Sequence, residues 1–118
     1  MRYYNTESFE RLDKKYKDIL ERYFPDYNKW GVWILFDESG EPETMEICQL
    51  IDATRNGATW EHYANIARYD DGTWEVNTQF NGKDENEMWV FGQWKRFANA
   101  VRIVACGDFE KMKPLKKY

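Results

Sequence analysis

The sequence predicts an α+β domain with an N-terminal helix, a four- to five-stranded antiparallel meander and a C-terminal helix. Three observations indicate this order: an apolar stripe at helical spacing near the start, alternating segments separated by turn formers in the middle, and a second helical stripe near the end. Because one face of an antiparallel sheet can stay in contact with water, the simplest arrangement packs both helices on one face of the sheet. A chain of 118 residues is expected to form a single domain over 1–118.

The first helix is expected over residues 6–24. Asn5 or Thr6 can serve as its N-cap, and Pro25 ends it because proline cannot continue a helix. Its apolar side chains recur at three- and four-residue steps and are Phe9, Leu12, Tyr16, Ile19, Leu20 and Tyr23. One side of this helix is therefore expected to face the core.

Residues 30–37 are expected to form the first strand. Their continuous apolar run, from Val32 to Phe36, is typical of a strand that is buried on both faces, which predicts a central position in the sheet. The segment 37–42 is rich in turn formers and favours a hairpin after this strand.

The return strand of this hairpin is expected over residues 43–52. Two sets of side chains alternate along it, namely Met45, Ile47 and Ile51 against Glu46, Cys48 and Leu50. A helix that starts at Pro42 and is capped at Gly57 also fits the spacing of the apolar residues. The strand is favoured because the preceding turn naturally closes a hairpin.

A second hairpin is expected from residues 60–69 and 73–80, with a short connection in which Gly72 supplies a positive φ. Alternation assigns three side chains of the later strand to the core face: Trp74, Val76 and Phe80. It assigns three side chains of the earlier strand to the opposite, outer face: Tyr63, Asn65 and Tyr69.

The last third of the chain is expected to hold a short strand over 88–91 and a helix over 93–105. The alternative is a helix that begins at Asp84 and bends at Gly92. The basic tail over 108–118 is expected to be loosely ordered.

Charge and aromatic content narrow the classes of function. The net charge is −4, and 18% of the residues are aromatic, enough to fill a core and to leave rings for a binding surface. Acidic residues are concentrated over 37–46 and 70–87. Because these segments would repel a phosphate backbone, direct nucleic-acid binding is not favoured. Because the longest apolar run cannot cross a bilayer and the N-terminus shows no signal-peptide core, we expect a cytoplasmic location and no membrane partner.

No catalytic or metal-binding motif is recognisable. His62 is the only histidine, and Cys48 and Cys106 are separate thiols that are expected to be reduced. Since a zinc site needs clustered cysteine and histidine, neither a metal nor another cofactor is expected. The enzymatic alternative uses His62 or strand carboxylates. The carboxylates concerned are Asp52, Glu61 and Glu75.

The leading hypothesis is a non-enzymatic binding or inhibitor protein that occludes a surface of a macromolecular partner. Aromatic rings on the outer face would anchor the partner, and acidic loops would steer a basic protein, such as one that handles nucleic acids, toward that face. The residues expected to bind the partner are Tyr63, Tyr69, Asp70, Asp71, Glu75, Asn77, Asp84 and Glu85.

Two further classes stay open. Tyr63 and Tyr69 would stack on bases in a module that binds single-stranded nucleic acid. An open sheet face or an edge strand would pair with a second copy in a homodimer. The small size, acidity and aromatic richness are compatible, by composition alone, with inhibitors encoded by phages and mobile elements or with toxin-immunity proteins.

Overall fold

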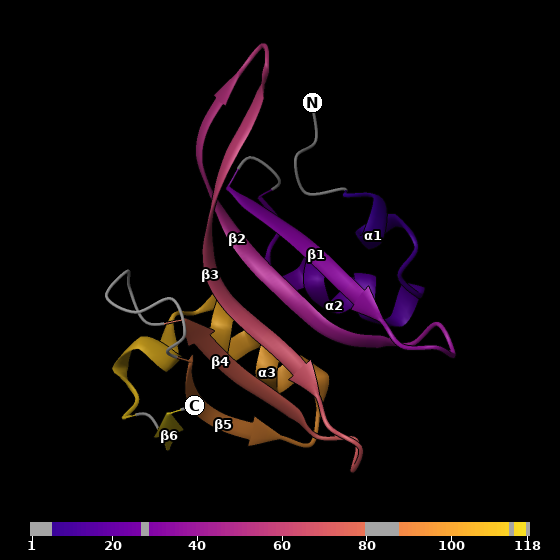
Figure 1. The fold of residues 1–118 in the computed structure, drawn as a ribbon, viewed down its shortest axis with the longest axis vertical. Helices are drawn as coiled ribbons and strands as arrows, with labels where there is room; N and C mark the ends of the chain where they lie inside the picture. The colour runs from indigo at the N-terminus through magenta and orange to yellow at the C-terminus, as the bar shows by residue number, and fades with distance from the viewer. Residues whose placement is uncertain (1–5, 27–28, 80–87, 114, 118) are drawn as a thin grey trace.

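A computed structural model describes residues 6–26, 29–79, 88–113 and 115–117 (Figure 1). Two helices begin the described chain, strands follow, and a third helix lies near the end, which confirms the predicted α+β class. The elements are α1 (Glu7–Glu10), α2 (Lys14–Tyr23), β1 (Trp30–Phe36), β2 (Pro42–Thr54), β3 (Gly57–Arg68), β4 (Trp74–Gln79), β5 (Met88–Trp94), α3 (Phe97–Ala105), the 3-10 helix η1 (Asp108–Lys111) and β6 (Lys116–Lys117).

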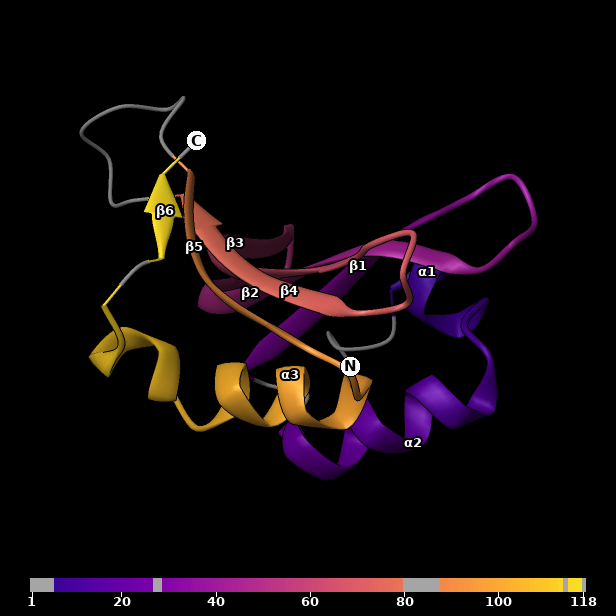
Figure 2. The same cartoon turned by 90° about the horizontal axis from the view of Figure 1, so that it is seen from below.

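The strands form one antiparallel meander, in which each strand pairs with the next along the chain from β1 to β6. As predicted, α2 and α3 lie on the same face of the sheet, where they contact one another (Figure 2). We call the opposite face the outer face. It is defined by a row of side chains across β1 to β4, which are Trp33, Glu46, Asn65 and Asn77.

The core lies between the inner face of the sheet and the helices. Its most deeply buried side chains, at most 1% exposed, include Phe9, Leu20, Phe24, Val32, Met45, Ile47, Ile66, Val76, Val101 and Val104. Those of the strands alternate with outer-face residues, as the pleat of a strand requires. Removal of this apolar surface from water is the main contribution to the stability of the fold.

The expected helix over 6–24 is interrupted, and the prediction of one continuous helix was wrong. α1 ends at Glu10, and α2 begins again at Lys14. Between them Asp13 adopts an extended conformation, and its Oδ1 accepts a hydrogen bond from the Lys14 backbone N–H at 2.8 Å. A short side chain that bonds nearby backbone groups competes with helix continuation, so that Asp13 acts as a second N-cap.

β1 lies at the edge of the sheet, and the predicted central position was wrong. Its alternate residues face opposite sides: Val32 is fully buried, whereas Leu35 is 70% exposed. Side chains around α1 bond the free edge of the strand. Thr6 Oγ1 donates to Val32 O at 2.6 Å, and the Ile34 N–H donates to Ser8 Oγ at 2.9 Å. These bonds cover part of an edge that would otherwise be open to another strand.

The segment after the first turn is a strand, so the helix alternative that started at Pro42 was wrong. The β2–β3 hairpin extends beyond the rest of the sheet (Figure 1). Ile51 was expected on the face of Met45, but it is 57% exposed. The pairing passes from Leu50 directly to Asp52 and leaves Ile51 as an extra residue, which breaks the alternation at that point.

The C-terminal helix begins later than expected because Gln93 and Trp94 belong to β5, where they pair with Glu75 and Trp74 of β4. The alternative helix that begins at Asp84 and bends at Gly92 was wrong for the same reason over 88–94, and its first residues lie outside the described part. The predicted basic tail contains η1 and β6 in its described part. Phe109 of η1 is 3% exposed, so this segment contributes to the core. The part of the chain that the structure describes contains no helix with the length and apolar character needed to cross a membrane.

Candidate binding surface on the outer face

Tyr63 lies on the helix side of the sheet, and its predicted place on the outer face was wrong. The pairing passes from Ile47–Ala64 to Cys48–His62, so that Tyr63 is the extra residue of a β-bulge. A bulge breaks the strict alternation of side chains, which explains the error. The ring packs against Trp30 and Phe109, with centroids 5.3 Å and 5.1 Å away. Burial raises the pKa of Tyr63 to about 12, and the nearby Glu110 carboxylate adds to the shift.

Three other predicted residues do lie on the outer face, where they form a chain of hydrogen bonds. Tyr69 Oη donates to Glu75 Oε1 at 2.5 Å, and Asn77 Nδ2 donates to Glu75 Oε2 at 2.7 Å. Asn65 Nδ2 continues the chain by donating to Asn77 Oδ1 at 3.1 Å. Glu75 is 2% exposed and Asn77 is 4% exposed. In this structure these two polar side chains therefore stabilise the sheet and are not accessible to a partner.

Two acidic turns lie at the same end of the sheet, as a meander requires for the β1–β2 and β3–β4 connections (Figure 1). Asp70 and Asp71 are exposed in the second turn. Hydrogen bonds from the Thr73 hydroxyl and N–H lower the pKa of Asp71. We call this region the acidic end and define it by Asp37, Glu38, Glu41, Asp70 and Asp71. Asp84 and Glu85, also predicted to bind the partner, lie outside the described residues.

Asp37 organises the first acidic turn. Its Oδ1 accepts hydrogen bonds from the Ser39 hydroxyl and N–H and from the Glu41 N–H, at 2.7 to 3.0 Å. Its Oδ2 pairs with Nη2 of Arg68 on β3 at 2.5 Å. The Ser39 hydroxyl makes the largest contribution to a pKa of Asp37 that is lowered to about 2. Asp37 is therefore ionised over the whole neutral range.

Besides Tyr69, the outer face carries two tryptophan rings that the sequence-based prediction missed. Trp33 of β1 and Trp60 of β3 meet edge to face, with centroids 5.2 Å apart and an interplanar angle of 77°. A Cβ on Gly31 would lie 2.6 Å from Trp33 Cζ3, so that glycine is needed for the indole to rest against the strand. The structure places Trp33 between the core residues Val32 and Ile34, so its side chain faces away from the core.

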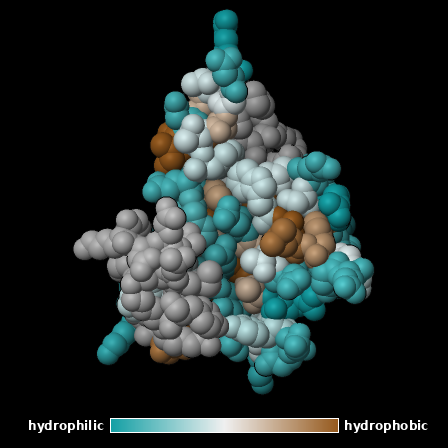
Figure 3. Space-filling model, viewed as in Figure 1, coloured by the Kyte–Doolittle hydropathy of each residue, from teal (hydrophilic) through white to brown (hydrophobic). Residues whose placement is uncertain are grey.

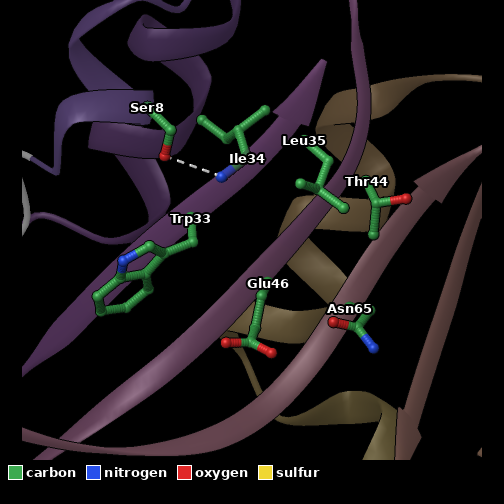
Figure 4. Close-up of a pocket in the computed structure, with 7 residues that line it drawn as sticks. All are labelled: Ser8, Trp33, Ile34, Leu35, Thr44, Glu46 and Asn65. Carbon is green, nitrogen blue, oxygen red and sulfur yellow. Dashed lines mark hydrogen bonds between the residues drawn. The ribbon is translucent and has the colours of Figure 1, made fainter. Parts of the chain in front are cut away.

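A groove of about 390 Å³ lies beside Trp33 on the outer face. We call it the outer-face groove, and its lining residues are Ser8, Trp33, Ile34, Leu35, Thr44, Glu46 and Asn65. Glu46 of β2 lies between Trp33 of β1 and Asn65 of β3, because these three residues pair directly across the strands (Figure 4). Figure 3 shows an apolar patch over β1 on this face, among hydrophilic side chains.

The carboxylate of Glu46 contacts the thiol of Cys48 and the ring of His62, the histidine considered for catalysis. Cys48 Sγ donates to Glu46 Oε1 at 3.1 Å, and His62 Nδ1 lies 3.3 Å from Glu46 Oε2. Burial raises the pKa of the Cys48 thiol, and the hydrogen bond to Glu46 raises it further. A thiol that stays protonated is a poor nucleophile. Cys48 is therefore better suited to orient the Glu46 carboxylate through its hydrogen bond than to carry out covalent catalysis.

The remaining carboxylates considered for catalysis do not join this cluster. Asp52 and Glu61 are exposed and lie along the β2–β3 hairpin. Among the residues that the structure describes, no group of three His, Cys, Asp or Glu side chains is placed to hold a metal ion.

Comparison with known proteins found no family model that matches the sequence, no similar curated protein and no matching solved structure. The fold and the outer face are therefore the basis for a functional proposal.

Proposed function

We propose that the protein is a non-enzymatic binding or inhibitor protein, which docks its outer face on a basic protein partner and occludes the surface it covers. Proteins that handle nucleic acids present such basic surfaces and are the class of partner we favour. One observation carries the proposal. The sheet face that α2 and α3 leave open carries three apolar side chains, which are Trp33, Leu35 and Trp60. We call them the anchor patch, and they lie on the same sheet as the acidic end.

The anchor patch has the features of a binding hot spot. Tryptophan is enriched among interface residues that contribute most to affinity, and apolar anchors work best when they are rigid before binding. Trp33 is held by the ring of Trp60 and by the backbone at Gly31. Leu35 is 70% exposed and lies near the end of β1, two residues before Asp37 of the acidic end.

The acidic end supplies the charge that would steer a basic partner. Its carboxylates belong to turns that connect β1 with β2 and β3 with β4, so that they border the outer face at one end. Lys95 and Arg96 follow β5 at this end, which concentrates the acidic charge on the β1–β4 side. Complementary charge of this kind accelerates association and makes it sensitive to salt.

The test begins with affinity purification of the tagged protein from its native cells and identification of captured proteins by mass spectrometry. Leu35→Ser should weaken capture of the true partner at least about tenfold by removing an apolar anchor. Ile51→Ser is the matched control, because Ile51 is also a large exposed apolar residue, at 57%, but lies on the projecting hairpin. A partner that is retained by Leu35→Ser, or lost equally with both variants, would contradict the proposal.

The steering component is tested with the purified partner at low and high salt. Asp70→Lys combined with Asp71→Lys should slow association about tenfold or more at low salt and approach the wild-type rate at high salt. Asp52→Lys combined with Glu61→Lys makes the same change of charge on exposed hairpin residues and is the control. Equal rates for all three proteins would remove the acidic end from the proposal. Tight binding to single-stranded oligonucleotides in the same assay would favour the nucleic-acid alternative instead.

A further inference from the structure

We infer that the outer-face groove is an arginine-binding subsite, which receives the guanidinium group of an arginine side chain on the docked partner. The inference rests on the proposed function for the source of the arginine. The affinity of the groove for a guanidinium group is a separate property of the groove and is tested by itself.

The walls of the groove combine a ring, a carboxylate and neutral acceptors. Trp33 supplies an indole, Glu46 a carboxylate, Thr44 a hydroxyl and Asn65 an amide, from three neighbouring strands. Side chains that pair directly across strands have Cβ atoms roughly 5 Å apart. A planar guanidinium that contacts the indole face is therefore within reach of the Glu46 carboxylate, in a cation–π contact combined with a charge-assisted hydrogen bond.

The buried hydrogen-bond chain on the outer face fixes which atom of Asn65 faces the groove. Both carboxylate oxygens of Glu75 accept, so Asn77 must present its Nδ2 to Glu75 and its Oδ1 to Asn65. Asn65 then donates its Nδ2 away from the groove, toward β4. Figure 4 shows the amide oxygen of Asn65 turned to the side of Glu46.

The amide oxygen of Asn65 and the carboxylate of Glu46 are consequently two hydrogen-bond acceptors that lie next to each other without a donor between them. Within the described part of the chain, no donor is hydrogen-bonded to Asn65 Oδ1. The Glu46 oxygens each accept one contact, from Cys48 and from His62, and each keeps a second lone pair. Cys48 and His62 also hold the carboxylate in one orientation. The groove thus combines apolar walls with two open acceptors, which a ligand with an apolar stem, several donors and positive charge would match.

Arginine fits these requirements better than lysine. A guanidinium offers five N–H donors in a plane and stacks on aromatic rings, whereas an ammonium is a compact charge with three donors and a stronger hold on water. The volume of about 390 Å³ is at the lower end of ligand sites, which suits one side chain presented from a protein surface. The acidic end of the same sheet matches the basic character of such a partner.

The test is an NMR titration of the full-length protein with N-acetyl-arginine methylamide, compared with the neutral N-acetyl-citrulline methylamide. Arginine should shift the indole N–H signal of Trp33 and the side-chain amide of Asn65 saturably, with a dissociation constant on the order of millimolar. Citrulline should bind at least about tenfold more weakly, because it lacks the charge. The same amount of binding for both ligands would overturn the inference, and so would shifts confined to the acidic end.

Variants separate the groove from general attraction by acidic charge. Glu46→Gln should weaken arginine binding about fivefold or more, whereas Glu43→Gln, which removes an exposed carboxylate from the same strand, should change it less than about twofold. Trp33→Leu should also weaken binding, and it serves as a second test if Glu46→Gln perturbs the fold. N-acetyl-lysine methylamide that binds as tightly as the arginine compound would overturn the choice of arginine.

The two proposals can fail independently. Arginine binding in the groove without a partner that depends on Leu35 would leave the subsite standing and overturn the proposed function. A partner that is lost with Leu35→Ser but captured equally by Glu46→Gln would support the proposed function and overturn the arginine subsite.

Discussion

Tyr69 donates its phenol hydrogen to Oε1 of Glu75 across 2.5 Å on the outer face of the sheet. Glu75 is a carboxylate with only 2% of its surface exposed, and burial of such a group is unfavourable unless both oxygens are hydrogen-bonded. Asn77 supplies the second donor at 2.7 Å. The pair therefore stabilises one region of the fold and, through Asn77, sets the orientation of Asn65 beside the groove.

Tyr69→Phe should lower the free energy of unfolding by about 1 to 3 kcal/mol, because it removes the donor while leaving a buried acceptor without that bond. The measurement is urea unfolding at neutral pH. Tyr23→Phe is the matched control and should cost under about 0.5 kcal/mol, since the Tyr23 hydroxyl makes no hydrogen bond to the described residues. Equal stability of Tyr69→Phe and the wild-type protein would show that Glu75 finds a replacement donor.

Asp37 should make the fold sensitive to acid. Its folded pKa of about 2 lies below the ordinary value of 3.8, so the unfolded chain takes up a proton first as the pH falls. The stabilisation is complete above about pH 5 and is lost as the pH falls toward 2. The free energy of unfolding measured from pH 2 to 7 should therefore decrease less steeply on acidification for Asp37→Asn than for the wild-type protein.

A second substitution identifies the cause of the Asp37 shift. Ser39→Ala removes the hydroxyl that contributes most to it and should move the acid-sensitive range toward the ordinary pKa of an aspartate. If the free energy of unfolding depends on pH below about pH 5 in the same way in both variants and in the wild-type protein, this account of the turn is contradicted.

Phe109 should be essential for stability although it lies outside the main helices and strands. Its ring is 3% exposed and meets Phe91 and Tyr63 at centroid distances of 5.3 Å and 5.1 Å. Phe109→Ala should therefore cost about 3 to 5 kcal/mol through loss of buried area and creation of a cavity. Thermal and urea unfolding measure this effect. Leu115→Ala, at a position 73% exposed, should stay within about 0.5 kcal/mol; comparable losses for both would refute the assignment of Phe109 to the core.

The α1 contacts should keep the edge of β1 from pairing with a second copy. Thr6→Val combined with Ser8→Ala removes the hydroxyls that bond Val32 O and the Ile34 N–H, and should cost about 1 kcal/mol per bond. Exposure of these groups should increase self-association, which sedimentation velocity detects over a range of concentrations. Thr59→Val, on the exposed hairpin, is the control. Identical sedimentation of all three proteins would show that the edge is protected by other means.

Local sequence patterns were sufficient where a feature depends on residues adjacent in the chain. Gly72 has the expected positive φ of 83°, and Trp74 and Val76 face the core as alternation predicted. Phe80, expected on the same face, lies outside the described residues. Prediction failed at Tyr63 because the bulge that turns its ring arises from pairing with β2, and alternation within β3 contains no sign of it.

The candidate binding surface was predictable only in part for the same reason. Acidic turns are visible as charged segments, and Asp70 and Asp71 are exposed as expected. The anchor patch was missed because the apolar run of β1 was interpreted as burial on both faces. Whether Trp33 and Leu35 are covered depends on the position of β1 in the sheet, which the run itself does not encode.

From the sequence alone come the α+β class and the order of helices and strands, because periodicity and turn formers act over a few neighbouring residues. The placement of both longer helices on one side followed from the rule that one face of an antiparallel sheet can stay in contact with water. The tertiary structure decided that β1 forms an edge, that Trp33 instead of Tyr63 meets the outer face, and that Glu46 lies against Cys48 and His62. The edge position of β1 depends on the order of the strands in the sheet. The faces of Tyr63 and His62 depend on the register between β2 and β3, where a shift of one residue reverses the face of a side chain.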